Sequence, residues 1–388
     1  MELLENKFES VFGKEYDYAF FAPGRINLIG EHIDYSGGNV FPCAITNGTY
    51  ALVRIRDDHK FRFVSLNVSD TEVLEIDASD LAYDENHGWV NYAKGIIATI
   101  AQKGLSIDTG FEVLYYGNIP NGAGLSSSAS LGIVTAEFIR KINQLPLSDL
   151  DLVVVTKDSE NQYIGVNTGI MDQFTVMFGQ KDTALRLNTE TLDYERVPVQ
   201  LEGHKIVIMN TNKQRALADS KYNERLEECA RALSIIQNHY DVSELCQLNR
   251  EQLEAIVDAF RDDMVAYRRA RHAISENDRV HRAVRKLRHG ELLAFGKLLN
   301  ASHKSLKDDY EVTGKELDTI VEAAWDEASC IGARVTGAGF GGCAIAIVTT
   351  DAIPTFIKNV GNKYKEVIGY EANFYVAEIG DGSHEIKR

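Results

Sequence analysis

The chain has 388 residues, 44% hydrophobic and 25% charged, which excludes the disordered and fibrous classes and is typical of two to three globular domains. The formal net charge of −16 disfavours nucleic acid and anionic membrane surfaces as partners. The five cysteines form no CxxC pair, and residues 1–12 lack the basic head and apolar stretch of a signal peptide. We therefore expect a cytoplasmic protein with reduced thiols and no membrane segment.

The predicted elements of the first half, taken in chain order, are mainly strands. Short runs of β-branched and aromatic residues recur up to residue 125, and one pattern of helical period interrupts them. The strand-like runs are residues 50–55, 61–66 and 111–116, the interrupting helix covers about residues 89–103, and helices at 127–142 and 148–163 precede further strands at 184–187 and 204–210.

The second half is predicted to be rich in helices, and the composition changes near residue 200. Helical periodicity covers residues 219–236, 262–288, 291–305 and 315–329, and strands return near residue 333 and at 343–348. Strands on both sides of long helices indicate an α+β protein with two domains. We place these domains at residues 1–200 and 201–388.

A glycine and serine run, which we call the second glycine loop (residues 117–130), lies between a predicted strand and a predicted helix. Gly122 and Gly124 let backbone amides approach an anion, while Ser126, Ser127 and Ser128 add hydroxyl donors beside the positive end of the helix dipole. The loop therefore suits a phosphate chain. The alternative is a glycine turn with a serine N-cap, which leaves three consecutive serines unexplained.

A glycine-rich segment near the C-terminus, the third glycine loop (residues 337–342), is the nearest match in the chain to GxGxxG. It falls between two strand-like segments, whereas a dinucleotide fingerprint leads into a helix. The GxxxxGK[ST] pattern of a Walker loop is absent from the sequence. A permissive hairpin is the alternative interpretation.

The first glycine loop (residues 22–38) concentrates ionisable side chains. Arg25, Glu31, His32 and Asp34 lie within ten positions and close to four glycines. Two carboxylates and an imidazole offer acceptors and a switchable donor, which a pocket for a polyhydroxy substrate requires. A metal site and a solvated surface turn are the alternatives, although one histidine beside two carboxylates is a weak metal signature.

Together, the three loops resemble the three motifs of the GHMP kinases. Residues 24–38 (GRINLIGEHIDYSGG) resemble the galactokinase signature of that superfamily, and the likeness continues through residues 169–174, 220–225 and 334–342. The resemblance implies a two-domain GHMP kinase fold, with an N-terminal domain like ribosomal protein S5 domain 2, a ferredoxin-like C-terminal domain with extra helices, and the active site in the cleft between them. It also implies ATP and Mg²⁺ as cofactors and D-galactose as the partner substrate, in a monomer or weak homo-oligomer.

The resemblance assigns roles to residues of this chain. Asp172 would accept the proton of the C1 hydroxyl, and Arg25 would bridge that hydroxyl and the γ-phosphate. Glu31, His32, Asp34, Gly169 and Tyr222 would bind galactose hydroxyls, and Ser127 and Glu160 would hold magnesium. The nucleotide would be held by Gly122, Ala123, Gly124, Leu125, Ser126, Ser127, Ser128 and Ala129, with Trp89 and Tyr92 around the adenine.

Three other interpretations remain open at this point. The same chemistry could act on N-acetylgalactosamine or on arabinose, because kinases for these sugars carry similar loops. A galactose- and ATP-binding sensor without turnover is a second alternative, although it would have no need of Asp172, Arg25 and the serines of the second glycine loop. Each charged site residue also has a structural reading, with Asp172 and Arg25 as a buried ion pair and Glu160 as a solvent-facing charge.

Overall fold

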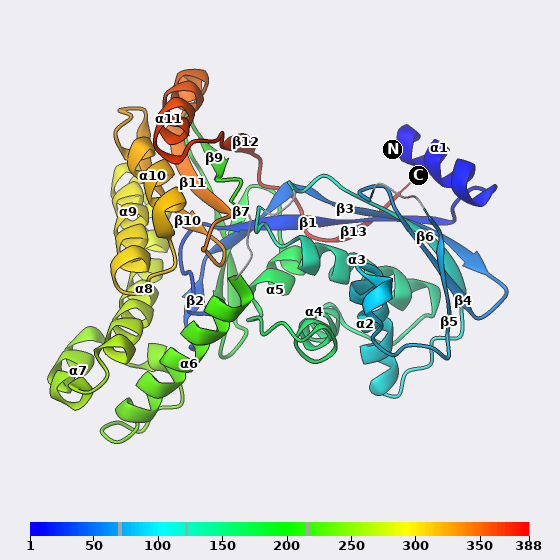
Figure 1. The fold of residues 1–388 in the computed structure, drawn as a ribbon, viewed down its shortest axis with the longest axis horizontal. Coiled ribbons are helices and arrows are strands. Elements are labelled where there is room, and N and C mark those ends of the chain that lie inside the picture. The colour runs from blue at the N-terminus through cyan, green and yellow to red at the C-terminus, as the bar shows by residue number, and fades with distance from the viewer. Residues whose placement is uncertain (69–71, 121–122, 214–217, 388) are drawn as a thin grey trace.

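The computed structural model describes residues 1–68, 72–120, 123–213 and 218–387, the side chains of residues 218–220 excepted. Its strands form a six-stranded, a four-stranded and a three-stranded sheet. The two larger sheets lie at opposite ends of the molecule, and the small sheet lies between them (Figure 1). Within the described residues, no helix combines the length and the apolar character that a bilayer crossing needs.

The six-stranded sheet is built mainly from the N-terminal half. Its order is β13 (His384–Ile386), β1 (Tyr18–Asn27), β3 (Pro42–Arg56), β6 (Gly110–Gly117), β4 (Lys60–Ser65) and β5 (Leu74–Asp77). Helices α2 (Val90–Gln102), α3 (Ser127–Ile142), α4 (Asp149–Asp158) and α5 (Met171–Phe178) cover one face, and α1 (Glu2–Phe12) packs on the other (Figure 1). The strand β13 returns from the far end of the sequence and pairs with β1 in antiparallel fashion.

The four-stranded sheet is built from the C-terminal half. Its order is β10 (Cys330–Thr336), β11 (Cys343–Thr349), β9 (His204–Asn210) and β12 (Asn373–Ala377), with every pair antiparallel. Helices α8 (Met264–Arg288), α9 (Leu292–Asp308), α10 (Gly314–Trp325) and α11 (Ile353–Ile368) stand along its side (Figure 1). The three-stranded sheet is β2 (Asn39–Val40), β7 (Thr183–Asn188) and β8 (Tyr194–Pro198), while α6 (Ala218–Ile236) and α7 (Arg250–Ala255) complete the helical part.

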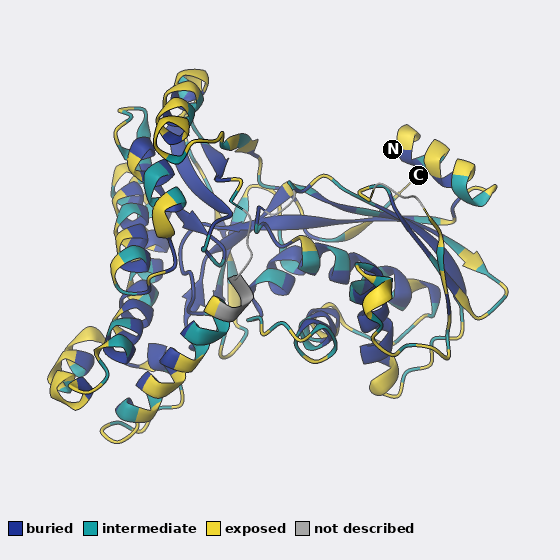
Figure 2. Cartoon of the chain, viewed as in Figure 1, coloured by how far each residue is buried: buried dark blue, intermediate teal, exposed yellow. Residues whose placement is uncertain are grey.

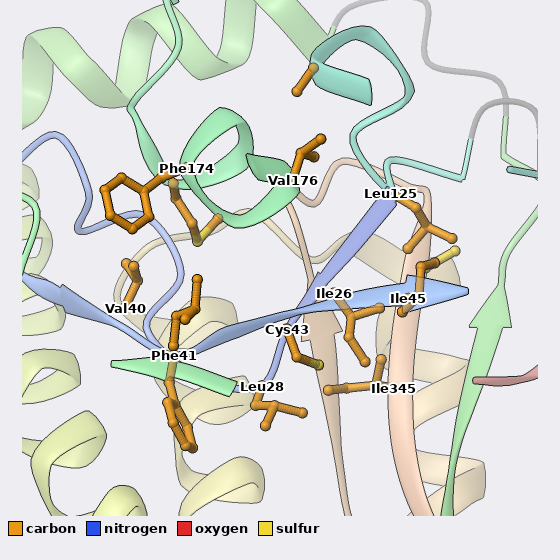
Figure 3. Close-up of a cluster of buried hydrophobic side chains, with 14 of the residues drawn as sticks. Ile26, Leu28, Val40, Phe41, Cys43, Ile45, Leu125, Phe174, Val176 and Ile345 are labelled. Atoms are coloured by element: carbon orange, nitrogen blue, oxygen red, sulfur yellow. The ribbon is translucent and has the colours of Figure 1, made fainter. Parts of the chain in front are cut away.

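Burial follows this layering. The long central strands β1, β3, β6, β9 and β11 are mostly buried, whereas the helices carry exposed residues on their outer sides (Figure 2). One apolar cluster occupies the place where β1, β3, α5 and β11 meet, and it includes Ile26, Leu125, Phe174 and Ile345 (Figure 3). Ile26 follows Arg25 in the chain, and Leu125 precedes Ser126. The core therefore holds rigidly the backbone that carries the candidate site residues.

Most predicted elements are confirmed. The helix at 127–142 and the strand at 204–210 have the predicted ends. The helix predicted for 148–163 is α4 followed by a π-helix (Ser159–Ile164), and the helix predicted to reach residue 329 ends at Trp325. The prediction lacked α1, α5, α11 and β13. The division of the chain near residue 200 stays a prediction.

Candidate active site

The three glycine loops meet in the structure. Gly24 approaches the second loop so closely that an added Cβ would lie 2.7 Å from the Leu125 carbonyl oxygen. Gly337, at φ 79°, approaches the same loop, and a Cβ there would lie 2.9 Å from the Gly124 carbonyl oxygen. Only glycine permits both approaches without displacement. The structure therefore brings together the three segments singled out in the sequence.

A cavity of about 380 Å³ opens beside this junction, bounded by the first and third loops, by residues 164–172 and by α6. We call it the sugar cavity. It contains every residue predicted to bind a sugar or to act on it: Arg25, Glu31, His32, Asp34, Gly169, Asp172 and Tyr222.

The Arg25 guanidinium and the Asp172 carboxylate form a two-pronged pair at one wall of the sugar cavity. Nε donates to Oδ1 and Nη2 donates to Oδ2, both at 2.8 Å. Ser126 Oγ also donates to Oδ2 at 2.6 Å, and Arg25 Nη1 donates to the Gly124 carbonyl oxygen at 3.0 Å. Arg25 is buried, whereas 29% of the Asp172 side chain is exposed. Asp172 is thus oriented by two side chains and still open to the cavity.

Glu31 is anchored on both carboxylate oxygens. The Gly337 amide donates to Oε1, the Asn27 side-chain amide donates to Oε2, and Arg334 Nη1 lies 3.8 Å from Oε1. Burial raises the pKa of Glu31, and the charges of Arg334 and Arg25 oppose that rise. The first and third loops are therefore joined through this carboxylate.

Asp34 also lines the cavity and lies against Gly169. A Cβ at Gly169 would overlap the Asp34 carboxylate, so a glycine is required there. Burial, together with the nearby charges of Asp172 and Glu31, raises the pKa of Asp34 to about 7. Three carboxylates facing one cavity accept hydroxyl donors well and repel anions.

His32 and Tyr222 form the aromatic side of the sugar cavity. Their ring centroids lie 5.6 Å apart, and Tyr222 comes from α6. Both ring nitrogens of His32 contact protein groups, namely the Tyr35 hydroxyl at 2.6 Å and the Ala338 carbonyl oxygen at 3.0 Å. The imidazole therefore lines the cavity with its hydrogen-bonding capacity already engaged.

A second cavity of about 320 Å³, the nucleotide cavity, opens on the other side of the second glycine loop. Its lining includes Trp89, Tyr92, Ser127 and Ser128. Trp89 is half-buried and stands edge-on to Tyr115, with ring centroids 5.7 Å apart. The predicted adenine and phosphate residues are therefore adjacent.

The second glycine loop ends at the first turn of α3. Ser126, at φ 63°, precedes that turn but makes no side-chain cap, because its hydroxyl donates to Asp172. The interpretation of this serine as a simple N-cap is therefore wrong. Ser127 is exposed and Ser128 is half-buried beside the uncapped helix end, a setting that favours anions.

The remaining loop members contribute their backbone or lie outside the described residues. The side chains of Ala123, Leu125 and Ala129 are buried in the apolar core, so only their main-chain atoms are available to a ligand. Gly124 adopts φ 69° and offers its backbone without a side chain. Gly122 lies outside the described residues.

Glu160 sits on the π-helix and is buried, so its interpretation as a solvent-facing charge is wrong. Gln173 donates to Oε2 at 2.7 Å, and a hydrogen bond from the Ser128 hydroxyl to the carboxylate opposes the rise of its pKa. Oε1 has no partner at full hydrogen-bond geometry within the described part of the chain. Burial raises the pKa of Glu160 to about 7. A buried carboxylate oxygen without a partner is the environment that a cation relieves.

Comparison with known proteins identifies the family. The chain is 53% identical to a galactokinase of Exiguobacterium sibiricum, over 100% of this chain and 98% of that one. The chain belongs to the galactokinase family. A family model described as "Galactokinase galactose-binding signature" matches residues 6–55, and models of the GHMP kinase N-terminal and C-terminal domains match residues 91–180 and 283–366.

Solved structures agree with this assignment. The crystal structure of Lactococcus lactis galactokinase complexed with galactose superposes with a TM-score of 0.96 at 49% identity, covering 99% of both chains. A mevalonate kinase of Methanococcus jannaschii shares the fold alone, with a TM-score of 0.67 at 18% identity over 94% of this chain and 99% of the other. The predicted two-domain GHMP kinase fold and the predicted class, an ATP-dependent sugar kinase, are confirmed.

Several residues that shape this galactokinase-family site were missed in the sequence. Asn27, Gln173 and Arg334 lie inside the matched motifs, where their neighbours drew attention instead. Two others come from α8: His272 Nε2 contacts the Glu31 carbonyl oxygen at 3.0 Å, and Glu276 accepts from the Gly30 amide at 2.9 Å. No local pattern distinguishes these two from other polar residues of a long helix.

Proposed function

We propose that this chain transfers the γ-phosphoryl group of ATP to the C1 hydroxyl of D-galactose, giving galactose 1-phosphate and ADP. The observation that carries the proposal is the Arg25–Asp172 pair, which lies between the sugar cavity and the second glycine loop. Phosphoryl transfer requires a group that accepts the proton of the sugar hydroxyl and a cation that neutralises the transferred phosphoryl group. Both must lie where the sugar meets the phosphate chain. The Lactococcus lactis relative, described as a complex with galactose, supports this choice of sugar.

Galactose would be held by the carboxylates of the sugar cavity. Glu31 and Asp34 would accept hydrogen bonds from the sugar hydroxyls, and Tyr222 would pack against the sugar. Glu31 already receives donors from the protein, so it enters the complex oriented and loses little side-chain entropy on binding. Gly169 leaves the space in which the sugar approaches Asp34.

Asp172 would take the proton of the C1 hydroxyl. Arg25 and Ser126 hold its carboxylate so that the remaining acceptor capacity faces the cavity. A general base contributes typically about 10²- to 10⁴-fold, and a loose transition state asks for little early deprotonation. Orientation of the hydroxyl is therefore as much a part of the role of Asp172 as proton removal.

Arg25 would serve the other reactant. Its guanidinium reaches Asp172 with two nitrogens and the Gly124 carbonyl with the third. This position lets it neutralise charge that develops on the transferring phosphoryl group. The uncapped N-terminus of α3 adds backbone donors for the phosphates.

Glu160 and Ser127 would hold Mg²⁺. The fit rests on the Glu160 carboxylate, whose Oε1 lacks a partner among the residues described, and on oxygen donors, which Mg²⁺ prefers. The bound cation supplies neutralisation of phosphate charge. Trp89 and Tyr92 would pack around the adenine at the far end of the nucleotide cavity.

A sugar panel tests the proposal. Galactose, N-acetylgalactosamine and arabinose are each mixed with MgATP, and ADP release and the position of the new phosphate ester are measured. We expect ADP release at catalytic rates with galactose and an ester at C1. Faster turnover with N-acetylgalactosamine or arabinose would show that this sugar, and not galactose, is the substrate. Galactose binding without ADP release would favour the sensor.

A further inference from the structure

His32 has an unusual backbone and a fully used side chain. Its φ of 59° places it in the left-handed region, which non-glycine residues seldom adopt, and its ring is buried. Nε2 lies 3.0 Å from the Ala338 carbonyl oxygen, and Nδ1 lies 2.6 Å from the Tyr35 hydroxyl. A strained backbone persists only where the surrounding structure stabilises it, and such residues are often found at functional sites.

The direction of the hydrogen bonds follows from the chemistry of the groups. A carbonyl only accepts, so Nε2 carries the hydrogen that Ala338 receives. Burial lowers the pKa of His32 to about 3, and the His272 ring and the charges of Arg225 and Arg334 act in the same direction. The ring is therefore neutral, and Nδ1 accepts from Tyr35.

The chain of hydroxyls continues away from the cavity. The Tyr35 and Tyr310 hydroxyl oxygens lie 2.9 Å apart, and Cys229 Sγ lies 3.0 Å from the Tyr310 oxygen. Because the Tyr35 hydroxyl donates its hydrogen bond to His32, its oxygen accepts one from the Tyr310 hydroxyl. The Tyr310 oxygen in turn accepts a hydrogen bond from the Cys229 thiol. We call Cys229, Tyr310, Tyr35, His32 and Ala338 the relay, and its donors all point toward the third glycine loop.

The far end of the relay is anchored in the helical part of the molecule. Tyr310 is fully buried, and its ring packs against His32 with centroids 4.9 Å apart. Arg269 lies over the same ring at 5.9 Å, and Arg225 Nε donates to the Tyr310 carbonyl oxygen at 2.8 Å. The Tyr310 hydroxyl therefore has one stable position from which to orient Tyr35.

The near end of the relay touches the sugar-binding carboxylate. Ala338 follows Gly337 directly, and the Gly337 amide donates to Glu31. The Ala338 carbonyl belongs to the peptide between Ala338 and Gly339, and the Gly337 amide belongs to the peptide between Thr336 and Gly337. Loss of the donor to Ala338 would therefore reach Glu31 through the backbone torsions of Gly337 and Ala338. The position of Glu31 thus depends on the hydroxyl of Tyr310, a residue outside the lining of the sugar cavity.

We infer that Tyr310 and Tyr35 are positioning residues for the sugar cavity, which hold His32 in one tautomer so that its Nε2–H fixes Ala338 and, through Gly337, Glu31. His32 acts on the sugar cavity through the third glycine loop. The inference rests on the proposed function only in its effect on galactose, because the tautomer itself is a property of the free protein.

The main test is Tyr310→Phe, which removes one hydroxyl and keeps the ring. We expect the KM for galactose to rise about tenfold, as for a buried hydroxyl left without its donor, while the KM for ATP and kcat stay within twofold. Tyr16→Phe is the matched control, since that buried hydroxyl donates to Glu5 at 2.7 Å on the opposite side of the six-stranded sheet. If Tyr310→Phe does not fold, Tyr35→Phe is tested by the tautomer of His32 and not by KM, because Tyr35 itself lines the sugar cavity.

A double-mutant cycle shows whether Tyr310 acts through His32. In His32→Gln the amide nitrogen can replace Nε2 as the donor to Ala338, but the amide oxygen lies beside it at the end of the side chain and not at the position of Nδ1. Adding Tyr310→Phe should therefore change the KM for galactose less than twofold further. Additive effects, or an unchanged KM in a folded Tyr310→Phe, would overturn the inference.

Nitrogen-15 NMR of histidine-labelled protein tests the tautomer without any turnover. We expect His32 with a protonated Nε2 and a bare Nδ1, and a shifted Nδ1 resonance in Tyr310→Phe. A proton on Nδ1 in the parent protein would contradict the relay. A protein that phosphorylates no galactose but shows the expected tautomer would refute the proposed function and leave the relay standing.

Discussion

The sugar cavity and the nucleotide cavity are built by different means. Side chains that already bond to one another line the sugar cavity, as in the Arg25–Asp172 pair and the doubly anchored Glu31. The nucleotide cavity relies on an exposed Ser127, a half-buried Trp89 and a bare helix end. A fixed polar network suits recognition of hydroxyl positions, whereas main-chain donors suit a phosphate chain common to many substrates.

This difference predicts how each side responds to mutation. Removal of one group from the sugar cavity leaves its buried protein partners unsatisfied, and that penalty adds to the weaker binding of the sugar itself. Ser127 and Trp89, two of the residues predicted to hold the nucleotide, are exposed and half-buried, so a substitution at either should weaken mainly the direct interaction with the nucleotide. Four substitutions, taken from the largest expected effect to the smallest, probe this contrast.

Asp172→Asn is expected to have the largest effect. The amide cannot take the hydroxyl proton, so kcat should fall by about 10²- to 10⁴-fold, while the Kd for galactose changes only a few-fold. ADP release and calorimetric titration with galactose measure the two quantities. Asp57→Asn, an exposed carboxylate in the turn after β3, is the control. Retention of most of kcat would remove Asp172 from the role of base.

Glu31→Gln is expected to come next. The new amide must place its NH₂ group against the Gly337 amide or the Asn27 amide, so donor faces donor. The KM for galactose should rise by about 10- to 100-fold, with a much smaller change for ATP. Glu137→Gln is the control, because that carboxylate is bonded to Ser383 away from both cavities. Equal effects on the two KM values would contradict the assignment of Glu31 to the sugar.

Trp89→Leu is expected to show the reverse pattern. Loss of base–aromatic stacking costs about 1–3 kcal/mol, so the KM for ATP should rise about tenfold while that for galactose is unchanged. The chain has two tryptophans, and Trp325→Leu is the natural control because its indole donates to Ala333 in the C-terminal half. An unchanged KM for ATP would place the adenine elsewhere.

Glu160→Gln comes last, because the effect that we predict for it is on stability and its sign depends on pH and on magnesium. Burial raises the pKa of Glu160 from 4.5 to about 7, so the folded state binds the proton more tightly and loses stability as pH rises through this range, on the order of 3 kcal/mol in total. Glutamine mimics the protonated form. The melting temperature of the variant should therefore be several degrees above that of the parent protein at pH 8. Near pH 4.5 the two melting temperatures should be equal.

With MgATP at pH 8 the parent protein should melt above Glu160→Gln. The magnesium ion neutralises the Glu160 carboxylate of the parent, whereas the amide of the variant carries no charge for it to neutralise. Melting curves at both pH values, with and without MgATP, measure both effects. Glu202→Gln, an exposed carboxylate, is the control. Identical melting of Glu160→Gln and the parent at pH 8 without MgATP would show that the carboxylate is not buried as described.

The sequence predicted the elements that carry their own signals. The helix at 127–142 begins after a glycine loop, and the strand at 204–210 is a continuous apolar run, so both have the predicted ends. Helix α5 has eight residues, too few for its period to separate it from a buried strand. The strand β13 has three residues and exists because β1 offers an edge, which no local pattern records.

The same limit applies to the site. The three loops could be assembled from the sequence because each carries glycines and charges in a recognisable order. The partners that orient them could not: Tyr310 lies next to His32 only in the folded chain, and Glu276 reaches Gly30 from the middle of α8. A Glu160 carboxylate oxygen that is buried and lacks a partner among the described residues is likewise a product of packing, since its neighbours in sequence are polar.

The most direct test of the account is a crystal structure with galactose and a non-hydrolysable MgATP analogue. We expect the C1 hydroxyl oxygen within about 2.6–3.2 Å of the Asp172 carboxylate and Arg25 facing the terminal phosphate, with the Arg25–Asp172 pair kept. The galactose hydroxyls should meet Glu31 and Asp34. A sugar that presents another hydroxyl to Asp172, or a terminal phosphate out of reach of Arg25, would contradict the account.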